Sequence, residues 1–403
     1  MKHSTRKGLI SLTAISSLVA GCGGGTGTQQ SIPNSPVVVT PNTGTESVLY
    51  SFGAAPDGQS SWAQLTKGVD GNLYGVTYSG GANGLGTFFR VTPAGVEQVL
   101  YSFGSNSADA QQPVSAVIQA NDGNFYGTTP TGGANGSGAA YMITPSGTET
   151  VIYSFGNGAT DGTAPYASLV QGTDNKLYGV TSAGGANSAG TVFNLTLAGT
   201  ESVLYSFDPT TTDGTGPVSA LIQGIDGNFY GTAPAGGANL NGAVYSITPG
   251  GIETVIYSFN PPPDGTYPFA ALVQDSQGNF YGDTYSGGTL YGGVVFKIDT
   301  SGNESVLYSF GTNTNDASDT KAPLILASDG YLYGTSTRGG ENGNGAIFRI
   351  TTAGIETPLY SFSSATTGQF PYATLTEGTG GLFYGTTISG GTNGFGVIYS
   401  YTP

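Results

Sequence analysis

Residues 167–207 read ASLVQGTDNKLYGVTSAGGANSAGTVFNLTLAGTESVLYSF. This stretch holds four short runs of β-branched, aromatic and other apolar residues, at 167–172, 176–181, 191–196 and 201–207. Such runs are typical of strands, and none shows the 3.6-residue period of a helix. Short polar turns join the first pair and the last pair, whereas a glycine-rich segment joins the middle pair. The pattern predicts a four-stranded antiparallel meander.

The same unit occurs seven times. A Tyr-Ser-Phe triplet ends each unit at intervals of 51 or 52 residues, beginning at Tyr50, Tyr101, Tyr153, Tyr205, Tyr257, Tyr308 and Tyr360. A Tyr-Gly pair recurs in step at Tyr74, Tyr126, Tyr178, Tyr230, Tyr281, Tyr333 and Tyr384. Repeats of about 50 residues with four strands are typical of β-propeller blades.

The two ends of the repeat array predict how the ring closes. A lone fourth strand, residues 46–52, precedes the first unit, and the last unit stops after its third strand, GVIYSYTP at 396–403. The N-terminal strand is therefore expected to complete the last blade, which removes two exposed edges. The sequence predicts an all-β, seven-bladed β-propeller of four-stranded antiparallel blades. A β-solenoid is the alternative, because it also stacks short strands.

The glycine-rich segment resembles a phosphate-binding loop only at first sight. SGGANGLG at 79–86 has neither the G-x-G-x-x-G nor the Walker spacing, and a strand pattern follows it where a helix would be needed. Because the segment occurs in all seven repeats, it indicates a structural role in the fold, and we expect no nucleotide binding. These glycine loops lie at 79–86, 131–138, 183–190, 235–242, 286–293, 338–345 and 389–396.

The N-terminus resembles a bacterial lipoprotein signal, with a basic start, a short apolar run and LVAGC ending at Cys22. The resemblance implies cleavage after residue 21, acylation of Cys22, and a place on the cell envelope, by expectation the outer membrane or cell surface. An ordinary secretory signal is the alternative. We expect a signal peptide at 1–21, a lipidated tether at 22–45 and the propeller at 46–403.

Composition limits the available chemistry. Loss of the signal removes the single histidine, His3, and three basic residues, leaving seven basic and 25 acidic residues and a formal charge of −18. Cys22 would be acylated, so histidine bases, cysteine nucleophiles and His/Cys metal sites are not expected. The negative charge argues against nucleic acid or anionic lipid headgroups as partners, so Cys22 would be the membrane attachment.

The repeat itself resembles a known family. Its pattern, LYG-x-T-x-x-GG-x-N-G-x-G followed by F-x-I-T-x-x-G-x-E-x-x-LYSF, is similar to the GloVer tandem-repeat family of exported bacterial proteins, over residues 46–403. The resemblance implies a surface-attached or secreted repeat protein. It implies no particular reaction or ligand.

Two sets of carboxylates have regular positions that predict structural roles. One set opens the outer strand, where charge discourages edge pairing: Glu46, Glu97, Glu149, Glu201, Glu253, Glu304 and Glu356. The other set lies in the first hairpin, where Asp suits the turn: Asp70, Asp122, Asp174, Asp226 and Asp329.

A third set of carboxylates precedes the inner strand by a constant spacing. It consists of Asp57, Asp109, Asp161, Asp213, Asp264 and Asp316, with Thr367 in the seventh position. These residues either stabilise a turn or form an acidic rim for Ca²⁺ or a cationic ligand. No EF-hand spacing supports Ca²⁺, and no other cofactor is expected.

Departures from the repeat mark candidate ligand-binding residues. One group of departures predicts a polar patch on one face, with drift in exposed loops as the alternative: Asp283, Tyr285, Tyr291, Lys321, Arg338 and Glu341. Another group places rings on the inner strand, where they either pack between blades or stack on a sugar: Trp62, Tyr166, Phe269 and Tyr372.

These features favour a monomeric, surface-displayed, non-enzymatic binding or scaffold module whose ligand is a glycan or a protein. A carboxylate-dependent carbohydrate-active enzyme is an alternative, with Asp283 and Glu341 as the first pair of acids to consider. A purely structural envelope protein is a third possibility.

Overall fold

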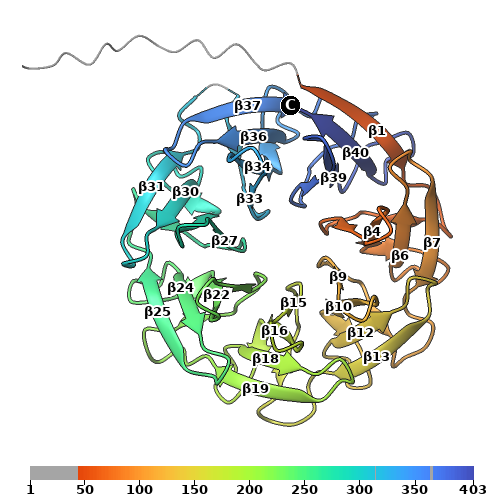
Figure 1. Cartoon of the computed structure of the whole chain (residues 1–403), viewed down its shortest axis with the longest axis horizontal. Helices are drawn as coiled ribbons and strands as arrows, with labels where there is room; N and C mark the ends of the chain where they lie inside the picture. The colour runs from red at the N-terminus through yellow and green to blue at the C-terminus, as the bar shows by residue number, and fades with distance from the viewer. Residues whose placement is uncertain (1–43, 314, 364–365) are drawn as a thin grey trace, which may run out of the picture. The chain divides into compact units, whose positions relative to one another are not determined.

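The computed structural model describes residues 44–313, 315–363 and 366–403. Over this part of the chain, seven four-stranded antiparallel sheets surround one central axis as the blades of a propeller (Figure 1). The seven-bladed fold predicted from the repeats is confirmed. The expected signal peptide, Cys22 and the tether up to residue 43 lie outside the described residues.

Each blade is a simple meander whose four strands follow one another from the axis outward. The blades are numbered in chain order. Blade 1 consists of β3 (Thr66–Lys67), β4 (Leu73–Thr77), β6 (Thr87–Val91) and β7 (Glu97–Ser102). Blade 2 consists of β9 (Ile118–Gln119), β10 (Phe125–Thr129), β12 (Ala139–Ile143) and β13 (Glu149–Ser154). Blade 3 consists of β15 (Val170–Gln171), β16 (Leu177–Thr181), β18 (Thr191–Leu195) and β19 (Glu201–Ser206). Blade 4 consists of β21 (Ile222–Gln223), β22 (Phe229–Ala233), β24 (Ala243–Ile247) and β25 (Glu253–Ser258). Blade 5 consists of β27 (Val273–Gln274), β28 (Phe280–Asp283), β30 (Val294–Ile298) and β31 (Glu304–Ser309). Blade 6 consists of β33 (Ile325–Leu326), β34 (Leu332–Ser336), β36 (Ala346–Ile350) and β37 (Glu356–Ser361).

Blade 7 closes the ring with strands from both ends of the chain. It consists of β38 (Thr376–Glu377), β39 (Phe383–Thr386), β40 (Val397–Thr402) and β1 (Thr45–Ser51). β1 pairs antiparallel with β40, with Val48 opposite Tyr399. The predicted closure by the N-terminal strand is confirmed.

The second strand of each blade is buried on both sides, as β4 is throughout its length. The glycine of the Tyr-Gly pair lies on this strand, and side-chain packing explains why it is a glycine. A Cβ on Gly75 would lie 2.5 Å from the ring of Phe89 on β6, so only glycine admits that ring. Between blades, the ring of Tyr74 packs at 4.2 Å on Phe125 of blade 2. The recurrent Tyr-Gly pair therefore builds the core within and between blades.

Short two-stranded sheets tie each glycine loop to the segment that links two blades. They are β2 (Gly58–Gln59) with β5 (Ser79–Gly80), β8 (Ala110–Gln111) with β11 (Thr131–Gly132), β14 (Gly162–Thr163) with β17 (Ala183–Gly184), β20 (Gly214–Thr215) with β23 (Ala235–Gly236), β26 (Gly265–Thr266) with β29 (Ser286–Gly287), and β32 (Ala317–Ser318) with β35 (Arg338–Gly339). A bridge between Gln369 and Ser389 takes their place in blade 7. The glycine loops and links thus share one face, as expected.

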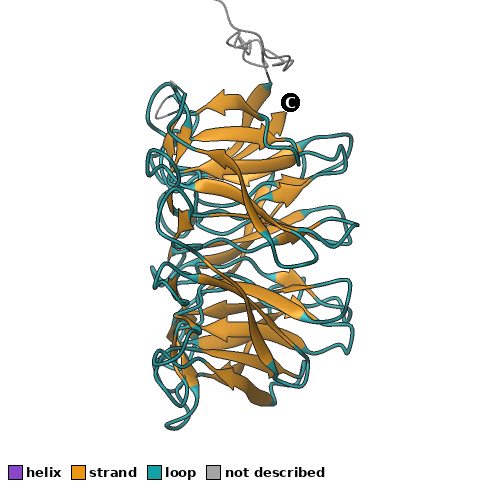
Figure 2. Cartoon of the chain, turned by 90° about the vertical axis from the view of Figure 1, so that its left-hand side faces the viewer, coloured by secondary structure: helices purple, strands orange, loops and turns teal. Residues whose placement is uncertain are grey.

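The inner strand is shorter than predicted. β15 covers only two residues of the expected run 167–172. The residues before it, Tyr166 to Leu169, leave the ladder and line a cavity on the axis. Figure 2 shows the ring from the side, with the strands between two faces covered by loops. None of residues 44–313, 315–363 and 366–403 forms an apolar helix long enough to span a bilayer.

Candidate functional site

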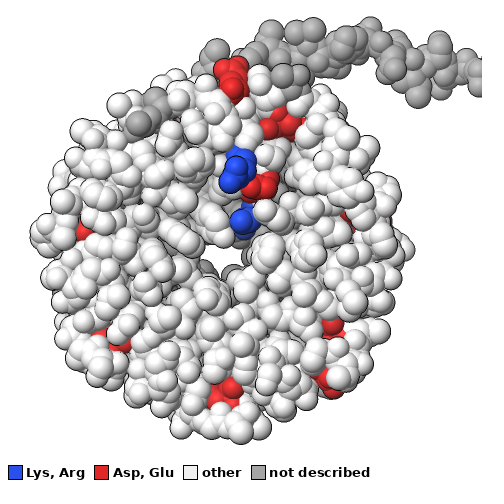
Figure 3. All heavy atoms as spheres, turned by 180° about the vertical axis from the view of Figure 1, so that it is seen from behind, with Lys and Arg blue, Asp and Glu red and all other residues white. Residues whose placement is uncertain are grey.

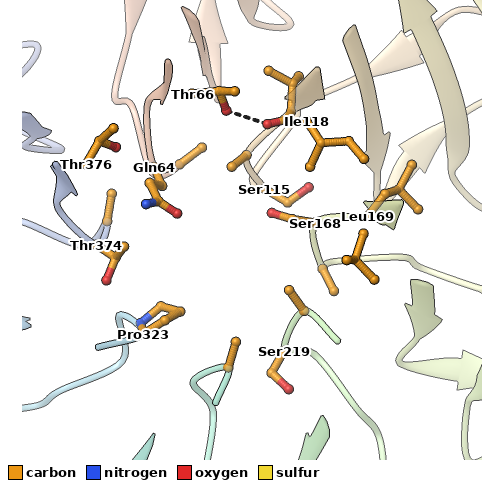
Figure 4. A pocket seen from close by; sticks show the side chains of 18 of the residues that line it. Gln64, Thr66, Ser115, Ile118, Ser168, Leu169, Ser219, Pro323, Thr374 and Thr376 are labelled. Carbon is orange, nitrogen blue, oxygen red and sulfur yellow. Dashed lines mark hydrogen bonds between the residues drawn. The ribbon is translucent and has the colours of Figure 1, made fainter. Parts of the chain in front are cut away.

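A channel runs along the propeller axis of the described ring. It has a volume of about 900 Å³, and the first strands of all seven blades line it. Figure 4 shows side chains such as Gln64, Ser168 and Thr374 around its open centre. The short first strand and the segment before it expose alternate residues to the axis, while the residues between them, such as Ala63 and Leu65, are buried.

The alternation arranges the lining in three layers. The layer next to the second strand is mostly β-branched: Thr66, Ile118, Val170, Ile222, Val273, Ile325 and Thr376. The middle layer has smaller side chains: Gln64, Ala116, Ser168, Ala220, Ala271, Pro323 and Thr374. The third layer follows the blade-to-blade links and has the largest side chains: Trp62, Val114, Tyr166, Val218, Phe269, Lys321 and Tyr372. A ligand would meet this third layer, which we call the channel mouth, on the face of the glycine loops.

Aromatic rings from blades 7 and 1 meet at the channel mouth. Trp62 stacks on Tyr78, with ring centroids 5.0 Å apart and an angle of 22° between the planes. Trp62 also lies 5.4 Å from Tyr372, with an angle of 41° between the ring planes. The hydroxyl of Tyr78 accepts a hydrogen bond of 3.0 Å from the Nε2 amide of Gln112. The indole N–H of Trp62 is buried and has no hydrogen-bond partner among the described residues.

Lys321 of blade 6 continues this wall. Its ammonium group lies 4.7 Å from the ring centroid of Tyr285 and 5.7 Å from that of Tyr372. Phe269 of blade 5 meets Tyr285 edge to face at 5.9 Å. The six residues form one contiguous run, which we call the aromatic arc: Tyr78, Trp62, Tyr372, Lys321, Tyr285 and Phe269.

The arc unites two groups of residues that the sequence analysis had kept apart. The inner-strand rings Trp62, Phe269 and Tyr372 meet Lys321 and Tyr285 of the predicted polar patch. Tyr78 was missed, although a signal existed. It occupies the same repeat position as Tyr285, four residues after the tyrosine of the Tyr-Gly pair. The other blades have Pro130, Ser182, Pro234, Thr337 and Ile388 there.

Other predicted ligand-binding residues lie apart from the arc. Tyr166 lines the channel in blade 3 and is half exposed. Tyr291 and Glu341 are exposed in glycine loops. Arg338 forms an ion pair of 3.0 Å with Asp319 and is largely exposed. Figure 3 shows one face of the ring, hollowed at its centre, with basic and acidic side chains gathered beside the hollow.

Asp283 is not at the surface. It lies in β28 with 1% of its surface exposed, and neither carboxylate oxygen has a hydrogen-bond partner among the described residues. Burial raises the pKa of Asp283 well above its usual value. Neither Asp283 nor Glu341 lines the channel. The structure therefore does not bring this pair of acids together around the channel.

The six aspartates of the expected acidic rim are each held at a separate blade junction. Each accepts a hydrogen bond of 2.5–2.9 Å from the hydroxyl of the Tyr-Ser-Phe tyrosine before it. Each also accepts one from a backbone N–H of the same link, as Asp109 does from Ser105 at 2.7 Å. In the described part of the chain, no three His, Cys, Asp or Glu side chains are grouped closely enough to hold a metal ion.

The glutamates that open the outer strands take part in the same junctions. The outer strands follow the circumference, so each begins where the preceding one ends (Figure 1). Oε2 of Glu149 therefore lies 3.5 Å from the hydroxyl of Tyr101 in the preceding blade. Burial, reinforced by Asp109, raises the pKa of Glu149 to about 8. These glutamates open the outer strands as predicted, and the structure places them as half-buried groups between blades.

Sequence comparison gives a family for nearly the whole chain. The model of the Gloeobacter/Verrucomicrobia repeat matches residues 24–224 and again residues 217–403. No curated protein sequence matches the chain.

Solved structures show the same fold at low identity. The extracellular domain of a proposed hybrid two-component system of B. thetaiotaomicron is 16% identical with a TM-score of 0.56, and the match covers 86% of this chain and 39% of that one. The extracellular domain of a proposed one-component system of the same organism is 12% identical with a TM-score of 0.57, and the match covers 90% of this chain and 42% of that one. This chain thus spans about two fifths of the length of these structures. A gluconolactonase from Xanthomonas campestris is 10% identical with a TM-score of 0.45, covering 92% and 93%.

Proposed function

This chain belongs to the Gloeobacter/Verrucomicrobia repeat family, and from its closed ring and aromatic arc we propose that it is a non-enzymatic glycan-binding protein displayed on the bacterial envelope. The binding site is the channel mouth. The Tyr-Ser-Phe and Tyr-Gly anchors hold the seven blades rigidly around it. Family membership supports a repeat protein but carries no ligand, so the ligand is argued from the site.

The arc is the observation that carries this proposal. Small-ligand sites are concave, with aromatic walls and few polar groups. Trp62 and Tyr372 present ring surface beside an open channel, and the apolar faces of pyranose rings are complementary to such rings. Gln64, in the layer below, offers its amide oxygen to a sugar hydroxyl group, while its Nε2 donates a hydrogen bond of 3.0 Å to the carbonyl of Leu375. A buried indole N–H without a partner at Trp62 supplies a further donor if the ring turns toward a ligand.

The proposal is tested by a glycan array followed by calorimetry on the full-length protein purified in detergent. We expect Trp62→Ala to weaken binding of the array hit at least about tenfold, which corresponds to about 1.4 kcal/mol. Val114→Ala is the matched control, because Val114 has the same position in blade 2 but lies outside the arc. Equal losses in both variants, or no glycan bound by the native protein, would contradict the proposal. Chromatography of the bound glycan tests for turnover, the sign of an enzyme.

Envelope display is the second part of the proposal. The B. thetaiotaomicron neighbours are extracellular domains, which agrees with a propeller outside the cell. Acylation of Cys22 would attach the ring through the tether, and two or three acyl chains hold a protein more firmly than one. We expect Cys22→Ser to move the protein from the membrane fraction to the soluble fraction. Retention of that variant in the membrane fraction would contradict lipid anchoring.

A further inference from the structure

The charge of the channel lining is opposite to that of the protein. The chain has 25 acidic residues and a formal net charge of −15, yet no Asp or Glu lines the described channel. Two lysines do, Lys67 and Lys321. Since fixed charges act most strongly at short range, a ligand in the channel meets positive charge from the side chains that line it. Asp319, two residues before Lys321, forms an ion pair with Arg338.

Lys321 is the cation at the channel mouth. Its position in the repeat is otherwise apolar or aromatic, with Val218 and Tyr372 as examples. No carboxylate of the described chain lies within ion-pair distance of Lys321, whereas Arg338 is paired with Asp319. The rings of Tyr285 and Tyr372 hold the ammonium group by cation–π contacts, which leave its N–H donors available to an anion.

Trp62 and Lys321 flank the same ring. The Trp62 ring lies 5.4 Å from the ring of Tyr372, and the Lys321 ammonium lies 5.7 Å from the same ring. A single sugar placed against Trp62 and Tyr372 therefore has the ammonium group within reach of a substituent on its ring. A neutral sugar leaves Lys321 without a charged partner, whereas a carboxylate satisfies it with a charge-assisted hydrogen bond.

We propose that the channel mouth selects saccharides that carry a carboxylate, that is, uronic acids, with the sugar face on Trp62 and the carboxylate on Lys321. This proposal rests on the proposed function and names the class of glycan. It assigns Lys321 as the residue that determines specificity and Trp62 as the residue that supplies affinity.

Calorimetry with matched ligands tests it. The probes are uronate tetrasaccharides (galacturonate, mannuronate and a glucuronate-containing chain) and the methyl ester of each, which has the same shape without the charge. We expect at least one acid to bind about tenfold more tightly than its ester at low salt, and this preference to shrink as salt is raised. Lys321→Met should remove the preference but keep ester binding, and Lys321→Arg should retain it.

Lys67→Met is the control, because Lys67 adds the same charge away from the channel mouth. Melting curves of all variants confirm that each is folded. Equal affinity of the native protein for acids and esters, or an unchanged preference in Lys321→Met, would overturn the inference and leave glycan binding standing. Absence of binding to any saccharide would overturn glycan binding and the inference together.

Discussion

The hydroxyl of Tyr360 donates a hydrogen bond of 3.2 Å to Oε2 of Glu46, a residue 314 positions earlier in the chain. Tyr101 and Glu149 make the corresponding contact, at 3.5 Å, between blades that follow one another in sequence. β1 therefore replaces the missing fourth strand of blade 7 both in the ladder with β40 and at the junction with blade 6.

This relationship predicts that the ring depends on β1. Removal of residues 1–52 exposes the edge of β40 and removes Phe52, which is fully buried. Burial of such a ring contributes up to about 3 kcal/mol, before the lost ladder is counted. We therefore expect a marked fall in the melting temperature.

Removal of residues 1–43 is the matched control, because it keeps β1 complete. Its melting temperature should equal that of the parent chain in thermal denaturation followed by circular dichroism. If the two truncations melt together, β1 does not close the ring in solution.

The junction glutamates predict a pH dependence of stability. Burial raises the pKa of Glu97 from 4.5 to about 7 and that of Glu149 to about 8. Between pH 4.5 and these raised pKa values, the folded chain holds protons that the unfolded chain has released. The free energy of unfolding therefore falls as pH rises through this window. Hairpin aspartates such as Asp70 have a lowered pKa, so they remove stability only as pH falls below 3.8.

We expect the melting temperature to be highest near pH 4.5 and to decline toward about pH 8. Melting curves at constant ionic strength measure this profile. Glu149→Gln removes one of the titrating groups and should make the alkaline decline shallower. A melting temperature that stays level or rises over the same window would show that the glutamates are ionised in the folded ring at no cost.

A buried hydroxyl predicts a stabilising substitution. Tyr141 is fully buried, and its hydroxyl has no hydrogen-bond partner among the described residues. Blade 3 has Phe193 at this position, so the blade tolerates a ring without the hydroxyl. Because an unsatisfied buried polar group costs about 1–3 kcal/mol, we expect Tyr141→Phe to raise the free energy of unfolding by about 1 kcal/mol. Urea denaturation measures it, and a loss of stability would reveal a partner for the hydroxyl.

The fold was predictable because repetition supplies seven copies of the same evidence, and the incomplete first and last repeats specify closure. The site was predictable only in part. Trp62 and Lys321 stood out as departures from the repeat, but their meeting at Tyr372 depends on the neighbourhood of blades 6, 7 and 1 around the axis. Asp283 also departs from the repeat. Sequence alone did not show that its strand is buried on both sides. Asp283 was therefore assigned to a polar patch on the surface, although its side chain lies inside the blade.

That burial makes Asp283→Thr the last prediction. Threonine has the corresponding position in four other blades, where its hydroxyl bonds the next blade, as Thr232 bonds the carbonyl of Ala270 at 2.9 Å. By register, the acceptor for blade 5 is the carbonyl of Ala322. Replacing an unpartnered carboxyl group with this hydroxyl should raise the free energy of unfolding by about 1–3 kcal/mol.

The gain should grow as pH rises above 3.8. Burial raises the pKa of Asp283, so the folded chain keeps its proton while the unfolded chain loses it, and the native protein is destabilised further with each step in pH. Asp283→Asn is the control, since it removes the charge and keeps the shape; it should abolish the pH-dependent part without supplying the threonine bond. Paired urea titrations at acidic and neutral pH separate the two contributions. A loss of stability in Asp283→Thr at neutral pH would mean that the carboxyl group has a favourable partner in solution, and Asp283 would then return as a candidate binding residue.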